Sequence, residues 1–473
     1  EAISPTRSQL PATFLNTAIA SGVPMEELLM QINPFDIGVV YDVAGNTRAM
    51  RKLKDRPEII DEHLKPIHKI ITETVLKFGG DIFLYEGDAQ LAIFPDGNEP
   101  GEANASYYIG QRTKRHFEAI YKAIQEEDAK NLKLEHIDPE EQVIGLRCVK
   151  FSPKGLLMHA ERGPGAVVSG DEALARRSKA EKMAKAKEFE IPARERIGAY
   201  YYEVHGTDAA HINRLIYQYP PPSYTGRPTK IRHLPASIPP DPDGINQDIK
   251  SAIDPRSAEE RVALMPTLRN IGVAVYIELL GIENPSQLRY IREIIARHYA
   301  QYGASIDKAI GNTLLVSFGA GFNTDQKDML ERATRASVET KMWLKTEIEP
   351  QLYVTAAVGI SNLDLTTRVT VGTTERNDST NLGDTHNTGA RIQAEAATRA
   401  RASHQTVIMV GEAAAGLTSF CEAEESTIHG IRGIGSMKMS EISDVKPPQK
   451  TKLHTSEDFV PPLVAGQEVP YGE

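Results

Sequence analysis

Two acidic side chains in the first half of the chain lie where strands are expected to end. Asp42 comes near the end of the apolar run 36–43 (DIGVVYDV), and Asp88 lies in the sequence Glu86-Gly87-Asp88, which predicts a hairpin turn. In a single sheet the two carboxylates would converge, and close carboxylates repel one another unless a hard cation lies between them. The pair therefore predicts a site for divalent metal ions. Taken singly, Asp42 also fits a helix N-cap and Asp88 an ordinary turn residue.

A second group of polar side chains lies in the second half of the chain. Asn387 and Arg391 lie four residues apart in an Ala-rich segment, so a helix would place both on one face. Taken alone, such a pair fits a solvated helix face without a ligand. In the first half, the turn 44–47 offers main-chain N–H groups at an expected helix N-terminus, which suits an anion.

The elements that position these residues occur twice. Residues 78–94 (FGGDIFLYEGDAQLAIF) align without a gap with residues 302–318 (YGASIDKAIGNTLLVSF). Apolar positions and the glycine of the turn are shared, whereas polar positions differ. Asp88 faces Asn312, and Leu84 faces Lys308. This pattern is expected of a duplicated domain whose two copies share one asymmetric site.

Two further blocks extend the repeat on either side. Before each hairpin a buried strand (36–43 and 271–280) leads into an amphipathic helix, and Pro66 predicts a kink or a helix start in the first. After it, residues 167–185 and 380–398 each show a strand end, a Gly-Asp pair and an Ala-rich helix. The expected fold class is an α/β sandwich, with two similar domains in tandem.

Composition shifts divide the chain into five parts. We expect an N-terminal segment (1–34), a first domain (35–205), a Pro-rich linker (206–269), a second domain (270–445) and a C-terminal tail (446–473). The linker contains PPP and IPPDPD, which cannot continue a strand or a helix. The tail shows no hydrophobic period, so we expect no regular structure there.

Overall composition limits the classes of partner and compartment. The 473 residues are 40% hydrophobic and 25% charged, which is typical of soluble chains. A net charge of −10 argues against a nucleic-acid surface, and without a run of about 18 apolar residues no membrane span is expected. Two cysteines are too few for a disulfide framework and indicate a reducing compartment, the cytoplasm by default. The chain begins at Glu1, so organellar import with a removed N-terminal segment stays an alternative.

The motifs resemble those of the class III nucleotidyl cyclases. The strongest are residues 42–47 (DVAGNT), 79–89 (GGDIFLYEGDA) and 380–391 (TNLGDTHNTGAR). Within that family the chain is most similar to the catalytic half of the soluble, bicarbonate-responsive adenylyl cyclases, and the resemblance covers most of the chain. It implies two tandem class III cyclase homology domains, with ferredoxin-like βαββαβ cores, packed as a pseudo-twofold heterodimer. One chain would then supply both halves of the site, so we expect a monomer to suffice for catalysis.

The resemblance also implies a reaction. In the family, ATP binds between the domains and is converted to 3′,5′-cyclic AMP and pyrophosphate, with two Mg²⁺ or Mn²⁺ ions. By position, the metal ligands would be Asp42 and Asp88 and the catalytic residues Asn387 and Arg391. The other substrate-binding residues would be Lys308 and Thr380 for adenine, with Gly45, Asn46, Thr47 and Lys438 for the rest of the nucleotide. The family usually carries an aromatic residue where this chain has Asn46.

The site related by the pseudo-twofold axis departs from the pattern at every position. Its residues would be Glu278 and Asn312, Leu84 and Val167, and Leu174 and Ser178. In the soluble cyclases this degenerate pocket binds bicarbonate through a Lys and an Arg. Arg177 matches the Arg and marks a regulatory pocket, but Leu84 stands at the Lys position, which disfavours a response to bicarbonate.

Two rivals to an adenylyl cyclase stay open. One is a catalytically silent cyclase-like protein that binds nucleotide or acts as a scaffold, which Asn46 and Leu84 motivate. The other is a guanylyl cyclase, which Lys308 and Thr380 disfavour, because the family reads guanine with an acid and a small residue at those positions.

Overall fold

The computed structural model describes most of both predicted domains. The described residues are 10–24, 27–53, 56–95, 98–130, 145–161, 165–191, 198–205, 208–211, 268–270, 272–318, 325–362, 366–373, 377–411, 421–431 and 435–445.

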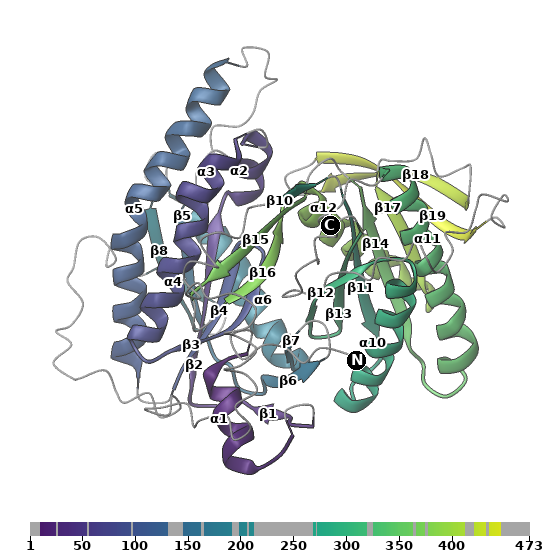
Figure 1. Cartoon of the computed structure of the whole chain (residues 1–473), viewed down its shortest axis with the longest axis horizontal. Helices are drawn as coiled ribbons and strands as arrows, with labels where there is room; N and C mark the ends of the chain where they lie inside the picture. Colours follow the sequence, from purple (N-terminus) through teal and green to yellow (C-terminus); the bar gives the residue numbers. More distant parts are fainter. Residues whose placement is uncertain are drawn as a thin grey trace, which may run out of the picture.

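The first domain is built on a six-stranded sheet with the order β3-β4-β2-β5-β8-β9. Its strands are β2 (Ile37–Ala44), β3 (Asp81–Glu86), β4 (Ala89–Phe94), β5 (Gly145–Phe151), β8 (Gly198–His205) and β9 (Asp208–His211). Helices α4 (Lys65–Lys77) and α5 (Glu99–Lys130) cover one face, and α1 (Ala12–Ser21) and α6 (Asp171–Glu188) cover the other (Figure 1). The run β2-α4-β3-β4-α5-β5 is the predicted βαββαβ core, and its strand order confirms the fold class.

Short helical pieces join β2 to α4. They are α2 (Asn46–Lys52), α3 (Pro57–Ile59) and the π-helical turn Ile60–Leu64. Pro66 lies in the first turn of α4, so of the two alternatives predicted there, a kink or a helix start, the structure has the helix start. A proline fits this position because its missing N–H would have no helical partner anyway.

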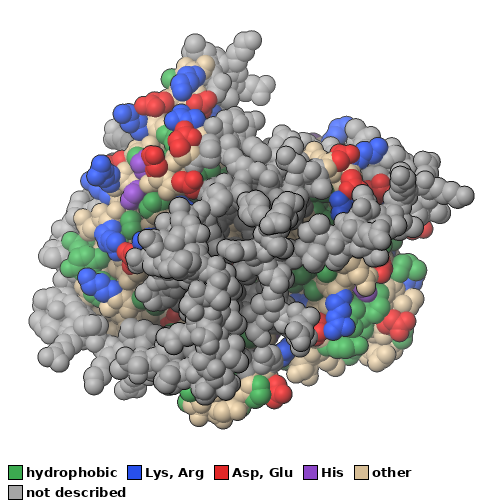
Figure 2. All heavy atoms as spheres, in the orientation of Figure 1, with side chains coloured by type: hydrophobic (Ala, Val, Ile, Leu, Met, Phe, Trp, Pro, Cys, Tyr) green, Lys and Arg blue, Asp and Glu red, His purple; other side chains and the backbone are tan. Residues whose placement is uncertain are grey.

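The outer surface of α5 carries interleaved acidic and basic side chains, at the upper left of Figure 2. Lys114 pairs with Glu118 and Lys122 with Glu126, each one helical turn apart. Such pairs stabilise a solvated helix face by about 0.2–0.5 kcal/mol each.

Among the described helices, none is long and apolar enough to cross a bilayer.

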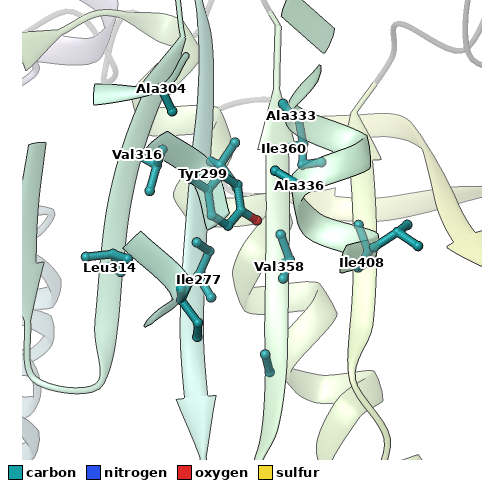
Figure 3. Close-up of a cluster of buried hydrophobic side chains, with 14 of the residues drawn as sticks. Ile277, Tyr299, Ala304, Leu314, Val316, Ala333, Ala336, Val358, Ile360 and Ile408 are labelled. Carbon is teal, nitrogen blue, oxygen red and sulfur yellow. The ribbon is translucent and has the colours of Figure 1, made fainter. Parts of the chain in front are cut away.

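The second domain repeats the architecture of the first. Its strands β12-β13-β11-β14-β17 lie in the same order as β3-β4-β2-β5-β8. The elements are β11 (Val273–Leu280), α10 (Pro285–Gln301), β12 (Ser305–Ile310), β13 (Thr313–Phe318), α11 (Gln326–Trp343), the π-helical turn Leu344–Ile348, β14 (Thr355–Ser361), α12 (Asp384–Ser403), β17 (Val407–Gly411), β18 (Cys421–Ile431) and β19 (Gly435–Val445). Helices α10 and α11 cover one face of this sheet and enclose the core drawn in Figure 3, whereas α12 covers the other.

Each domain lends a hairpin to the other. Hairpin β6 (Leu157–Glu161) and β7 (Gly165–Ser169), with β1 (Met30–Gln31) beside it, joins the second sheet through a parallel bridge from β7 to β12. Hairpin β15 (Thr366–Gly372) and β16 (Asn377–Leu382), with β10 (Leu268–Asn270), lies against α4 of the first domain. Val167 accordingly belongs to the core of the second domain and Val371 to the core of the first. Each domain therefore packs against a hairpin of the other, and α6 and α12 lie toward the middle of the molecule (Figure 1).

The backbone conformation of the turn explains why both repeated hairpins have a glycine there. Gly87 has φ 59° and Gly311 has φ 57°, values in the left-handed region that side-chain-bearing residues avoid. Both residues form the two-residue turns between the paired strands, so the repeat kept them while the side chains around them changed.

Parts of the predicted division fall on strands or outside the described residues. The range assigned to the linker contains β9 at its start and β10 at its end, and each is paired in a sheet. The Pro-rich run between them and the tail 446–473 lie outside the described residues. In the N-terminal segment, α1 packs on the first sheet through Phe14, so that segment is part of the first domain's body.

Candidate functional site

The two predicted metal ligands lie side by side. Asp42 of β2 is paired with Ala89 of β4, the residue after Asp88, and the main-chain N–H of Val43 donates to the carbonyl of Asp88 at 3.2 Å. Gly45, not Asp42, is the N-cap of α2, so the simple helix-cap explanation of Asp42 is wrong. Asp42 lies on the face of the sheet that α6 covers.

The two carboxylates lie close enough for the charge of one to act on the other. Burial and the nearby charge of Asp42 raise the pKa of Asp88 to about 7, although a hydrogen bond from Asn46 acts in the opposite direction. Two neighbouring carboxylates repel each other when both are ionised, and a bound cation would offset that repulsion.

Two basic side chains approach Asp42 from within the first domain. Arg147 of β5 forms an ion pair with Asp42 and a second one, at 2.5 Å, with Glu188 of α6. Lys185 of α6 lies 3.7 Å from the Asp42 carboxylate. Arg147 stands opposite Asp42 in the β2–β5 register, so the sheet itself holds the pair in place.

The donor set fits a divalent metal only in part. Among the described residues, no cluster of three or more His, Cys, Asp or Glu side chains could enclose an ion. Mg²⁺, however, is usually held by one or two carboxylates together with substrate phosphates, rather than by a complete protein cage. Asp42 and Asp88 supply that minimal set, and a metal ion would have to displace Arg147 from Asp42.

The predicted adenine residues reach across the interface to the hairpin that carries Asp88. Lys308 of β12 is 4% exposed and donates to the carbonyl of Tyr85 in β3. The hydroxyl of Thr380 in β16 accepts from the N–H of Gly87 at 2.9 Å. Because Gly87 directly precedes Asp88, the two predicted groups meet at one turn of the first domain.

An acid not singled out in the sequence completes this group. Asp378 of β16 lies 3.2 Å from the Lys308 ammonium and two residues before Thr380, on the same face of the strand. On the opposite face of β16, Asn381 donates to Asp307 of β12 at 2.6 Å. This bond ties β12 to β16 and therefore fixes the spacing between Lys308 and Thr380.

Asn387 and Arg391 lie in the first turns of α12. The helix starts at Asp384 after Gly383, and both side chains are half-buried. Helix α12, which carries the pair, contacts α2 of the first domain, whose N-cap is Gly45. The main chain of Thr47 is in α2, but its side chain lies outside what the structure describes.

Lys438 does not join these residues. It lies on β19, where its neighbours Met437 and Met439 face α12, so Lys438 points to the other side of the sheet. Its side chain is 63% exposed and pairs with Glu425 at 3.1 Å. Contact between Lys438 and a nucleotide held against α12 would require this strand to move.

The site related by the pseudo-twofold axis is filled by the protein's own side chains. Arg177 of α6 pairs with both carboxylate oxygens of Glu86 and, at 2.8 Å, with Glu181. Leu84 and Val167 are buried in core clusters, and a Cβ on Gly311 would lie 2.7 Å from Leu174. On the other side, Glu278 accepts from Gln393 and, at 2.7 Å, from Arg401.

Three residues of the candidate site were missed in the sequence: Arg147, Lys185 and Asp378. Their positions depend on strand register and on which elements face each other, and neither can be read from spacing. Asp378 alone carried a local signal, because an acid two residues before Thr380 must share its face in a strand.

Comparisons with known proteins find distant structural neighbours only. No family model and no curated protein matches the chain. The adenylyl cyclase CyaB from P. aeruginosa is 15% identical, covering 39% of this chain and 99% of its own, with a TM-score of 0.34. A class III adenylyl cyclase-like ATP-binding protein from Pseudomonas aeruginosa is 13% identical, covering 85% of this chain and 91% of its own, with a TM-score of 0.45. The guanylyl cyclase Cya2 is 20% identical, covering 39% and 97%, with a TM-score of 0.32. Similarities this distant assign no chemistry to the chain.

Proposed function

We propose that the chain is an adenylyl cyclase, which converts ATP to 3′,5′-cyclic AMP and pyrophosphate at one interdomain site. The observation that supports it most strongly is the meeting of both halves at a single turn. Asp88 follows Gly87 in that turn, Thr380 binds the Gly87 N–H, and Lys308 binds the neighbouring Tyr85 carbonyl. Residues of the kinds needed for metal and for adenine thus come from different domains to the same place.

In this proposal the protein orients the nucleotide for an in-line displacement. The ribose 3′ oxygen forms a bond to the α-phosphorus, the bond to the bridging oxygen breaks, pyrophosphate leaves with that electron pair, and the hydroxyl proton passes to water. Arg391 would stabilise the charge that builds on the α-phosphate, and Asn387 would hold the ribose. Asp42 and Asp88 would hold Mg²⁺ or Mn²⁺, which would lower the pKa of the hydroxyl and neutralise phosphate charge.

The base would be read by Lys308, Asp378 and Thr380. A lysine ammonium only donates hydrogen bonds, so it suits a ring nitrogen that accepts, as N1 of adenine does. The N1 position of guanine carries a proton instead and would oppose the ammonium.

Arg147 and Lys185, released from Asp42 by the metal, would lie near the β- and γ-phosphates. Gly45, Asn46 and Thr47 stay proposed phosphate contacts.

The test is turnover by the purified chain with ATP and Mn²⁺, read as cyclic AMP. Replacing Asp42→Asn removes a metal ligand while keeping the size of the side chain, so turnover should fall at least about a hundredfold. Glu278→Gln changes the corresponding residue of the other half and should leave turnover unchanged. Equal turnover in Asp42→Asn and the unmodified chain would contradict the two-metal site.

A second candidate is a silent cyclase-like protein that binds nucleotide without turnover. It is favoured by the ion pair of Asp42 with Arg147 and by the nearness of Lys185, because both cations oppose metal binding. In that case the chain would bind ATP and form no cyclic AMP, with either Mg²⁺ or Mn²⁺.

A further inference from the structure

A row of side chains crosses the second sheet beneath α12. In the strand register, Lys308 of β12 pairs with Leu315 of β13, Leu315 with Tyr276 of β11, and Tyr276 with Gly359 of β14. Directly paired residues project from the same face of a sheet. Tyr276 therefore shares the face of Lys308 at a distance of two strands, about 10 Å.

Helix α12 is shaped to receive the ring of Tyr276. Gly389 lies directly over it, where a Cβ would be 2.9 Å from one ring carbon and 3.1 Å from another. The His386 ring meets that of Tyr276 edge to face, with 6.4 Å between centroids. His386 and Gly389 flank Asn387 in the sequence and precede Arg391. Tyr276 thus shares a sheet face with the proposed base-reading lysine and packs against the first turns of the helix that carries Asn387 and Arg391.

Charged groups of both domains act on Tyr276. Tyr276 is partly exposed, and burial raises its pKa, with the charges of Asp307, Asp88 and Glu86 acting in the same direction. The hydroxyl therefore keeps its proton and is a donor, and two of the carboxylates near it belong to the hairpin of the first domain.

The corresponding row of the first domain shows that packing does not require this hydroxyl. There the register joins Leu84, Leu91, Val40 and Val149, and all four are buried in one apolar cluster. Val40 occupies the place of Tyr276. A polar group has thus replaced an apolar one only in the half that carries Lys308 and Asn387.

We propose that Tyr276 is a positioning residue for the sugar of the bound nucleotide, with its ring held against α12 and its hydroxyl donating to a ribose hydroxyl oxygen. In the proposed site the nucleotide runs from Lys308 on this sheet face to Arg391 on α12, and Tyr276 is a polar side chain of the same sheet face that contacts α12. This inference rests on the proposed nucleotide site, and it adds the residue that distinguishes a ribose from a sugar lacking hydroxyls.

The test compares two nucleotides that cannot be turned over. The α,β-methylene analogue of ATP keeps both sugar hydroxyls, whereas 2′,3′-dideoxy-ATP has neither. With Mn²⁺ present, calorimetric titration of Tyr276→Phe should show affinity for the first lowered roughly threefold to tenfold, the size of one hydrogen bond, and affinity for the second unchanged. Equal weakening for both nucleotides, or no weakening for either, would overturn the inference.

Tyr299→Phe is the matched control. Tyr299 lies in the core on the opposite face of the same sheet, and its hydroxyl bonds Ser337 at 2.7 Å (Figure 3). This variant loses a buried hydroxyl without touching the cleft, so both affinities should stay as in the unmodified chain. A sugar-dependent loss in Tyr299→Phe would mean that sheet packing, not contact with the sugar, causes the effect. If neither nucleotide binds the unmodified chain, the proposed function and the inference both fail. If both nucleotides bind but Tyr276→Phe shows no sugar-dependent loss of affinity, only the inference fails.

Discussion

Lys308 carries a charge into the interface between the domains, where its partners are Asp378 and the Tyr85 carbonyl. If its ammonium reads N1 of adenine, Lys308→Met should weaken ATP binding roughly tenfold or more, since hydrogen bonds to charged groups contribute about 1.5–3 kcal/mol. GTP binding should change much less, because guanine offers no acceptor at N1. Competition binding with both nucleotides measures the two losses, and Asp378→Asn in the same background avoids leaving that half-buried acid without its cation. Equal losses for ATP and GTP would argue against base reading by Lys308.

His68 makes the free energy of unfolding depend on pH. It is fully buried in α4, and burial together with the charge of Lys308 lowers its pKa to about 4. An unfolded His titrates near 6.5, so between these values the unfolded chain binds the extra proton, and stability falls as the pH falls from about 6.5 toward 4. The loss should reach about 2 kcal/mol at pH 5.

His68→Gln should remove that part of the pH dependence. Glutamine can still pair with Gln90, which now donates to His68 Nδ1 at 3.0 Å, and it does not titrate. Urea unfolding at pH 7 and pH 5 measures the free energy of unfolding of both chains. The same decrease in both would show that His68 is not the group responsible.

At the scale of elements, the sequence predicted what local patterns control. The two hairpins, their glycines and the strand–helix–hairpin order could be predicted, because apolar period and left-handed turns are properties of short segments. Pro66 left a kink or a helix start open, and the βαββαβ core was implied by the family resemblance. The exchange of hairpins between domains could not be predicted, since it depends on which sheet edge lies nearest in space. Arg147 was missed for the same reason: it meets Asp42 only through the pairing of β2 with β5.

Helix α6 holds the hairpin that carries Asp88. Two guanidinium nitrogens of Arg177 donate to the carboxylate of Glu86, the residue just before the Gly87 turn. Removing one partner of a largely buried pair leaves an uncompensated charge, so Arg177→Met should lower the free energy of unfolding by about 3 kcal/mol. The double change Arg177→Met with Glu86→Gln should cost less than the sum of the two single changes. Urea unfolding of the four chains measures the coupling, and strictly additive costs would mean that the pair does not hold the hairpin.

At the scale of the whole molecule, the two ends of the interface are closed by different kinds of bond. At one end, the Gly311 N–H donates to the main-chain carbonyl of Val168 at 2.7 Å, within a sheet that continues from β7 into β12. At the other end, the Gly87 N–H donates to the side chain of Thr380 at 2.9 Å. The first end is therefore expected to act as a hinge, and the second to open for the nucleotide.

Amide hydrogen exchange tests this asymmetry. In the unmodified chain without nucleotide, the Gly87 amide should exchange faster than the Gly311 amide, because one side-chain bond holds it instead of a sheet. Thr380→Val keeps the shape of the side chain but removes the acceptor, so exchange at Gly87 should rise roughly fivefold to tenfold while Gly311 stays unchanged. A rise at both glycines would mean that the domains separate as a unit, and no rise at Gly87 would mean that Thr380 does not hold that end closed. If only Gly87 responds, the threonine that is proposed to read the base also holds this end of the interface closed, and its hydroxyl can serve both roles because it accepts two hydrogen bonds and donates one.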